Sequence, residues 1–348
     1  MDRQAKIRTA IIGYGRSGST LHADAIEKLD DFELTHVCDI DEEARNKAAQ
    51  RFQCKTYDDY RQMIKENDID LVVIVTRSDQ HCEMTCDCLA AGKNVLVTKP
   101  WAVDAHQAEK MIAAAGDSGK LLLPWLPARW GGDLLRLREL VKSGVIGKVF
   151  QVRRCQYLFS VRYDWQTQKK YGGGYLLNWG PHLIDQPIQL VGSPVKSVYA
   201  EMRQIINPGD VEDVFYAVMK TEDDVVIISE NNIAAPKLPN WVIQGDAGTI
   251  FAEGNKIEIH KIIPDKPNDR GGYGESFKIE VSVDEKSLDN SINWSNLYGD
   301  ALDIYCNIAG AIRGIHQYYV TLDSALNLTR VMDAVRLSNE KGQVIYLR

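Results

Sequence analysis

The chain has 348 residues, a formal net charge of −7, 45% hydrophobic residues and 26% charged residues. This composition is typical of a globular protein with room for two domains, and the acidic balance argues against nucleic acid as a main partner. No uncharged apolar run is long enough to span a bilayer, and no apolar stretch precedes the first expected strand. Seven cysteines without framework spacing fit a reducing compartment, so we expect a cytoplasmic protein.

The first expected element is a buried strand over residues 7–12, which runs directly into Gly13-Tyr14-Gly15-Arg16-Ser17-Gly18. Between a strand and a helix, this glycine pattern is a dinucleotide-binding fingerprint. Gly13 permits the tight turn, Gly15 lets a pyrophosphate approach the backbone, and Gly18 lets the helix pack closely on the strand. We therefore expect the phosphates to lie on amides at the N-terminus of the helix.

The helix after this loop is predicted over residues 20–29, with an apolar face made of Leu21, Ala25 and Leu29. A second strand follows at 34–38, and Asp39 lies 21 residues past Gly18, near the spacing at which a carboxylate meets an adenosine ribose. Such a carboxylate accepts hydrogen bonds from the ribose hydroxyls and repels a 2′-phosphate. Asp39 therefore predicts NAD as the cofactor rather than NADP, and the neighbouring Ile40 is a further candidate for the cofactor site.

Strands and helices alternate up to residue 124, with further strands at 71–75 and 94–97 and a helix at 106–115. This alternation predicts an α/β fold whose first domain, residues 1–124, is a Rossmann domain with a doubly wound parallel sheet. His81, Cys82, Cys86 and Cys88 fall on another helix, where only Cys82 and Cys86 share a face. Because a zinc site needs convergent ligands, we expect no metal.

The second domain, residues 125–348, is predicted to be α+β, with a large, mainly antiparallel open sheet that binds substrate. A helix at 134–142 precedes closely spaced strands at 149–159, 195–203, 214–219, 225–228, 241–251 and 256–262, with a turn at 245–248. Helices would cover one face of this sheet and a second subunit the other, so we expect a homodimer or homotetramer. Residues 264–274 hold two prolines and three glycines and are predicted to form a mobile loop, a lid or a surface insertion.

Polar residues that follow the parallel strands are the first candidates for reacting groups, because ligands of open α/β sheets lie beyond the carboxyl ends of the strands. Thr98-Lys99-Pro100 follows one of these strands. Pro100 disfavours helical geometry at Lys99 and permits a cis bond, which would aim the lysine at the nicotinamide. There a lysine can hold a substrate hydroxyl and stabilise the alkoxide, whereas without this context Lys99 would be a solvated surface residue.

A second polar group lies in residues 172–186, Gly-Gly-Gly-Tyr-Leu-Leu-Asn-Trp-Gly-Pro-His-Leu-Ile-Asp-Gln. Pro181 suits the first turn of a helix, and the residues after it predict an apolar face and a polar face. The polar face consists of His182, Asp185, Gln186 and Gln189. A lone histidine near a helix start is more often structural, but the glycine run, which would let a ligand come close, favours a role for His182 in the site.

Together these segments resemble the glucose-fructose oxidoreductase / inositol dehydrogenase (Gfo/Idh/MocA) family over nearly the whole chain. The matching pieces are the glycine fingerprint and residues 76–81, 98–100, 143–148 and 172–185. The resemblance implies a Rossmann domain, a C-terminal domain with an open sheet, and reversible oxidation of a sugar or polyol hydroxyl. It also implies that Lys99 and His182 lie at the nicotinamide and the substrate, and that the cofactor site includes Thr76, Arg77, Ser78, His81 and Pro100.

The chain departs from the family pattern at three positions. Thr98 stands where the family usually has glutamate, Arg77 where it has proline, and Asn178 where it commonly has aspartate four residues before the histidine. An asparagine can orient a hydroxyl but cannot take its proton. We therefore expect His182 to be the general base, Lys99 to bind the hydroxyl and Asn178 to position it, with Asp185 orienting the imidazole.

Five of the seven tryptophans lie between residues 101 and 179, where aromatic faces could stack on the C–H faces of a sugar ring. Most of them would be core residues. Candidate substrate contacts are Arg129, Arg162, Tyr163, Trp165 and Asp185. We expect a neutral sugar, glycoside or polyol, with two alternatives: a glycoside-cleaving enzyme that oxidises its substrate transiently with NAD, and an NAD(H)-dependent sensor without catalysis, which only Asn178 favours.

Overall fold

The computed structural model describes residues 5–347, apart from 255, 268–273 and 283–297. The chain forms two compact units. The first contains Met1–Leu126, Lys170–Gly172 and Ala301–Thr329, and the second contains Pro127–Lys169, Gly173–Asp300 and Arg330–Arg348. Residues 301–329 thus belong to the first unit, although they lie far beyond the boundary expected at residue 124.

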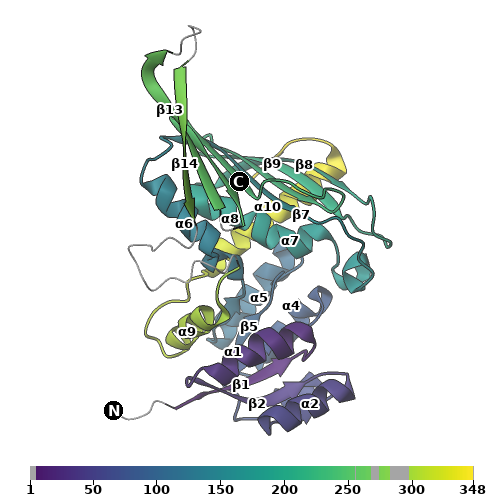
Figure 1. The fold of residues 1–348 in the computed structure, drawn as a ribbon. Helices are drawn as coiled ribbons and strands as arrows, with labels where there is room; N and C mark the ends of the chain where they lie inside the picture. The colour runs from purple at the N-terminus through teal and green to yellow at the C-terminus, as the bar shows by residue number, and fades with distance from the viewer. Residues whose placement is uncertain (1–4, 255, 268–273, 283–297, 348) are drawn as a thin grey trace. The chain divides into compact units, whose positions relative to one another are not determined.

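The first unit contains a six-stranded parallel sheet, which confirms the predicted Rossmann architecture (Figure 1). The strand order is β3-β2-β1-β4-β5-β6. Because parallel strands are covered on both faces, they read as continuous apolar runs, and all four residues of β4 are buried. The strands are β1 (Ile7–Ile12), β2 (Phe32–Cys38), β3 (Lys55–Tyr57), β4 (Leu71–Ile74), β5 (Asn94–Val97) and β6 (Leu122–Pro124).

Helices connect these strands, and carboxylates begin several of them. Asp41 accepts a hydrogen bond from the amide of Glu43, and Asp104 accepts one from the amide of Gln107, so each satisfies an amide in the first turn. The longer helices of the first unit are α1 (Ala23–Lys28), α2 (Glu42–Phe52), α4 (His81–Ala90), α5 (Ala105–Ser118) and α9 (Ala301–Ile312). A short α3 (Tyr60–Met63) and a 3₁₀ turn η2 (Ser78–Gln80) complete the connections.

The helix after the glycine loop differs from the prediction in which side chains it buries. It contains a π-helical turn η1 (Gly18–His22), in which the amide of Ala23 donates to the carbonyl of Gly18, before it continues as α1. A π turn takes one residue more than an α turn, so it shifts the faces of the helix. Leu21 is therefore exposed, while His22 and Ile26 are buried.

The second unit contains a nine-stranded sheet in the order β14-β13-β12-β11-β7-β10-β9-β8-β15. All neighbouring strands are antiparallel except β7 and β10, which confirms the mainly antiparallel sheet. The predicted turn at 245–248 joins β11 and β12. The strands are β7 (Val149–Tyr157), β8 (Val195–Arg203), β9 (Val214–Thr221), β10 (Val226–Asn232), β11 (Trp241–Gly245), β12 (Gly248–Glu253), β13 (Lys256–Pro267), β14 (Gly274–Ser282) and β15 (Ile345–Tyr346).

One face of this sheet is packed against helices, and the alternation along β9 shows it: Phe215, Ala217 and Met219 are buried, while the residues between them are half-buried. Figure 1 shows helices along this face. They are α6 (Gly132–Lys142), α7 (Tyr175–Leu183) and α8 (Asp185–Val191), and α10 (Leu322–Lys341) follows near the end of the chain. On the opposite face Tyr199 and Phe251 are exposed.

The prediction of a loop over residues 264–274 is wrong for the first part of that segment. Residues 264–267 belong to β13, and Pro267 pairs with Gly274 of β14 across an irregular stretch of the ladder. Prolines are tolerated at such irregularities because no ladder amide is needed there. Residues 268–273 lie outside the described part of the chain. Among the described residues, no helix has the length and apolar character that crossing a membrane requires.

Candidate nucleotide site and catalytic helix

The glycine loop after β1 is built by close contacts at its first and last glycines. Gly13 has φ +93°, and a Cβ on it would lie 2.6 Å from the carbonyl oxygen of Val75. A Cβ on Gly18 would lie 2.1 Å from the carbonyl oxygen of Gly13. Both positions therefore require glycine, the first for its backbone conformation and the second for the packing of helix against turn.

Gly15 differs from both, because a Cβ on it would meet no atom within 4 Å. The helix begins immediately afterwards, at Arg16. Amides in the first turn of a helix have no intrahelical acceptor, and they carry the positive end of the helix dipole. The open side of the loop at Gly15 can therefore accept a phosphate group that these amides would bind.

Asp39 is fixed beside this loop. Its carboxylate accepts hydrogen bonds from the amide of Tyr14, at 2.6 Å, and from the amide of Asp41, at 2.9 Å. Arg45 donates from Nη1 to the carbonyl oxygens of Asp39 and Ile40, which fixes the chain after β2. The structure thus brings the predicted ribose-binding carboxylate to the glycine loop, and it leaves the Ile40 side chain 92% exposed.

The segments after β4 and β5 are joined by His81. Its Nδ1 lies 2.8 Å from the carbonyl oxygen of Pro100, and its Nε2 lies 3.1 Å from that of Thr76. The imidazole is 1% exposed, and burial lowers its pKa. Because both ring nitrogens face main-chain oxygens, we interpret His81 as a residue that positions these segments rather than one that contacts the cofactor.

Arg77, which stands where the family usually has proline, is held by a neighbouring aromatic ring. Its guanidinium lies 4.0 Å from the ring centroid of Tyr171, a cation–π contact within the first unit. The next residue, Gly172, has φ +67°, and a Cβ on it would lie 2.8 Å from the Cβ of Ser78. Thus the segment 170–172 packs tightly against the turn that follows β4.

Lys99 follows β5 at the same edge of the sheet as the glycine loop. The Lys99–Pro100 peptide bond is cis. The preceding Thr98 donates from both its amide and its hydroxyl to the carbonyl of Ile74, at 3.1 and 2.9 Å. The threonine that replaces the usual glutamate therefore fastens the end of β5 to the end of β4. In the first unit, the carboxyl edge of the sheet thus holds the glycine loop, Asp39, Thr76 and Lys99.

In the second unit, Asn178 and His182 share helix α7, which begins earlier than predicted. The helix begins at Tyr175, so Pro181 lies in its last turn and His182 lies near its end, not near its start. His182, predicted on the polar face of this helix, is only 6% exposed, because the helix packs against the sheet. The rings of Trp179 and Tyr298 lie 5.9 and 5.5 Å from the imidazole, between ring centroids.

Asp185 and Arg129, both predicted near the substrate, form a buried ion pair. Arg129 donates from Nε and Nη2 to the two carboxylate oxygens, at 2.8 Å each, and the side chains are 2% and 1% exposed. Gln189 also donates to Asp185, at 3.3 Å. Because Arg129 engages both carboxylate oxygens, we interpret the pair as structural, instead of assigning Asp185 to the imidazole of His182.

The remaining candidate substrate residues lie between β7 and α7. Arg162 donates from Nε and Nη2 to the carboxylate of Asp164, at 2.8 and 3.0 Å, and its amide donates to Asn207. Tyr163 is 78% exposed, and Trp165 is half-buried at the start of a 3₁₀ turn. Of these residues, Tyr163 and Trp165 present aromatic surface to solvent.

Two groups of potential metal ligands lie in the first unit. Burial raises the pKa of Cys82 to about 11, which disfavours the thiolate that binds metals. A different group, His36, Glu66 and Asp68, lies within metal-binding distance of one another. However, Lys55 donates to the Glu66 carboxylate at 3.1 Å, so a cation already lies against this group.

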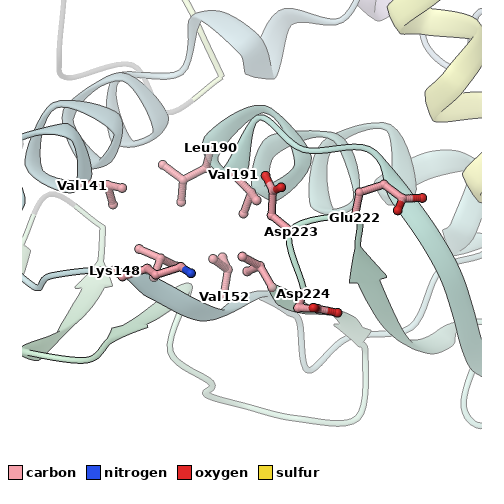
Figure 2. A pocket seen from close by; sticks show the side chains of 10 residues that line it. Val141, Lys148, Val152, Leu190, Val191, Glu222, Asp223 and Asp224 are labelled. Atoms are coloured by element: carbon pink, nitrogen blue, oxygen red, sulfur yellow. The ribbon is translucent and has the colours of Figure 1, made fainter.

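A cavity of about 520 Å³ in the second unit contains none of the predicted site residues (Figure 2). Figure 2 shows apolar side chains of α6, β7 and α8 on one side and the acidic turn between β9 and β10 on the other. The lining residues are Val141, Lys148, Val149, Val152, Leu190, Val191, Glu222, Asp223, Asp224 and Val225.

Residues 7–124 match the family model described as "Oxidoreductase family, NAD-binding Rossmann fold", and residues 134–251 match the GFO/IDH/MocA C-terminal domain. The chain is 31% identical to the uncharacterised oxidoreductase YdgJ of Escherichia coli, over 97% of this chain and 96% of that protein. It is 26% identical to scyllo-inositol 2-dehydrogenase (NADP(+)) IolW of Bacillus subtilis, over 98% of this chain and 96% of that protein. The WlbA dehydrogenase of Bordetella pertussis, solved with NADH and UDP-GlcNAcA, superimposes with a TM-score of 0.82 at 23% identity, over 100% and 99% of the two chains.

Proposed function

The chain belongs to the Gfo/Idh/MocA family of nicotinamide-dependent dehydrogenases that act on CH–OH groups, and from this premise we propose that it transfers hydride between NAD and a secondary hydroxyl of a neutral sugar, glycoside or polyol. The observation that carries the proposal is the carboxylate of Asp39, which the amide of Tyr14 holds beside the glycine loop. The family supplies the reaction class, and this contact supports the choice of cofactor.

The preference for NAD follows from charge. A carboxylate at Asp39 can accept hydrogen bonds from both ribose hydroxyls, whereas a 2′-phosphate would place a second negative group next to it. The relative IolW is named for NADP, so the family contains both preferences. The open loop at Gly15 would hold the pyrophosphate, and Lys99 and Thr76 lie at the strand ends where the nicotinamide is expected.

The proposed reaction divides the work among three side chains. Lys99, a cation, holds the substrate hydroxyl and stabilises the alkoxide that forms as the proton leaves. His182 takes that proton, and Asn178, one helical turn earlier on α7, orients the hydroxyl through its amide. Bound NAD supplies the hydride acceptor. The aromatic surfaces of Tyr163 and Trp165 are proposed to meet the sugar ring.

The experiment is to follow nicotinamide absorbance with NAD, and separately with NADP, across polyols, free sugars and glycosides. We expect reduction of NAD by a neutral substrate, and a His182→Ala variant should lower kcat by about 10²- to 10⁴-fold without changing NADH binding. A His182→Ala variant within tenfold of wild type would rule out His182 as the base. Glycoside cleavage without net NADH formation would favour the transient-oxidation alternative, and tight NADH binding without any turnover would favour a sensor.

The proposal includes a homodimer or homotetramer, supported by the exposed aromatic side chains Tyr199 and Phe251 on the face of the nine-stranded sheet opposite its helices. Multi-angle light scattering of the purified protein tests this directly. A monomer at micromolar concentration would contradict it.

A further inference from the structure

The helix that carries Asn178 and His182 is capped by a residue from another part of the chain. Its own N-cap residue is Gly174, which has no side chain to accept a hydrogen bond. Instead, Glu212 accepts hydrogen bonds from two amides of the first turn. Its main-chain carbonyl accepts from Tyr175, at 3.1 Å, and its carboxylate Oε1 accepts from Leu176, at 2.9 Å. A distant glutamate thus does what an N-cap side chain normally does.

The glycine run before α7 fits this arrangement closely. Gly174 has φ +107°, and a Cβ on it would lie 2.6 and 2.8 Å from the two carboxylate oxygens of Glu212. A Cβ on Gly173 would lie 2.5 Å from the carbonyl oxygen of Gln166. The sequence suggests that these glycines make room for a ligand. In the structure, the space beside them is filled by Gln166 and Glu212.

Glu212 is itself firmly placed. The next residue, Asp213, begins the connection into β9, is 1% exposed, and accepts hydrogen bonds from three successive amides. Those amides belong to Ile205, Ile206 and Asn207. Burial raises the pKa of Glu212, while the Leu176 amide acts in the opposite direction because it stabilises the carboxylate. A negative group here also faces the positive end of the α7 dipole.

We propose that Glu212 is a positioning residue of the dehydrogenase reaction, because it fixes the first turn of α7 and thereby the places of Asn178 and His182. The inference rests on the proposed function. The amide of Asn178 donates to the carbonyl of Gly174, so Asn178 closes the turn that Glu212 caps, and His182 lies one turn further on. If the capped turn loosens, the amide group of Asn178 moves first.

The test compares Glu212→Ala with Glu212→Gln, whose Oε1 can still accept from Leu176, and with Glu222→Ala, an exposed glutamate in the turn after β9. We expect Glu212→Ala to lower kcat by about 10- to 100-fold, the loss that a small misplacement of reacting groups produces. The dissociation constant of NADH should stay within twofold, because the glycine loop belongs to the other unit. Glu212→Gln should restore kcat to within about threefold of wild type, and Glu222→Ala should match wild type.

Hydrogen exchange of the α7 amides provides a readout that needs no substrate. Exchange at Leu176 and Asn178 should be faster in Glu212→Ala and close to wild type in Glu212→Gln. Wild-type kcat and wild-type exchange in Glu212→Ala would overturn the proposal. If that variant does not fold, Glu212→Asp takes its place with the same expected results, because the shorter aspartate side chain does not reach the Leu176 amide. A wild-type protein that oxidises nothing in the panel would refute the proposed function, while exchange would still decide whether Glu212 caps α7.

Discussion

The glycine loop can be tested by substitution, because Gly15 faces open space whereas Gly18 packs against the turn. At Gly15 an added methyl group meets open space, and φ lies outside the positive region that alanine avoids. Replacing glycine by alanine at such a position reduces the entropy of the unfolded chain, so Gly15→Ala should raise the free energy of unfolding by about 0.4–1 kcal/mol. At Gly18 the methyl group would lie 2.1 Å from the Gly13 carbonyl oxygen. Gly18→Ala should therefore lower the free energy of unfolding by about 1–3 kcal/mol.

Cofactor affinity should change in the opposite sense to stability for Gly15→Ala. The methyl group would occupy the side of the loop from which a pyrophosphate approaches the amides. Losing one hydrogen bond between an amide and a charged phosphate costs about 1.5–3 kcal/mol, which corresponds to about 10- to 150-fold weaker binding of NADH. The Gly15 variant should therefore be more stable than wild type and bind NADH much more weakly.

The two quantities are measured by urea unfolding without cofactor and by fluorescence titration of NADH. Gly116→Ala is the matched control, because a methyl group there also meets no atom within 4 Å, but on α5. It should be slightly more stable than wild type and bind NADH normally. Wild-type affinity in Gly15→Ala, or a loss of stability as large as in Gly18→Ala, would refute this assignment of the loop.

Three further predictions concern single side chains. Asp39→Asn keeps an acceptor of the same reach for the Tyr14 amide but removes the charge, so it should raise the ratio of kcat/KM for NADP over NAD by at least about tenfold; an unchanged ratio would contradict the role of Asp39. Asp185→Asn leaves the Arg129 guanidinium buried without its counter-charge, so urea unfolding should show a loss of about 3–5 kcal/mol, and a loss below 1 kcal/mol would mean that the pair is not buried in solution. Burial lowers the pKa of His22 to about 3, so the unfolded chain binds a proton there below pH 6.5 that the folded protein does not. Lowering the pH from 6.5 to 5 should reduce the free energy of unfolding of wild type by about 2 kcal/mol more than that of His22→Gln. An equal dependence on pH in the two proteins would show that His22 titrates normally.

The glycine loop and the place of Asp39 beside it could be predicted from sequence because their determinants are local. Gly13, Gly15 and Gly18 act within one strand, turn and helix, and Asp39 follows the next strand directly. What could not be predicted there is the π turn, which exposes Leu21 and buries His22. His22 is buried against Tyr305 of α9, whose hydroxyl lies 2.9 Å from its Nδ1 and 283 residues further along the chain. The residues of the helix alone do not predict a hydrogen-bond partner so far away in the sequence.

The same reasoning explains why the second polar group was only partly predictable. Proline favours the first turn of a helix, so Pro181 suggests a start there. The actual start is fixed by a hydrogen bond from Leu176 to Glu212, 36 residues away, and Asp185 is bound by Arg129, 56 residues away. Residue type alone marks Glu212 as an ordinary acid and Asp185 as a substrate ligand. Their partners in the fold favour structural roles for both, because Glu212 caps a helix and Asp185 neutralises a buried arginine.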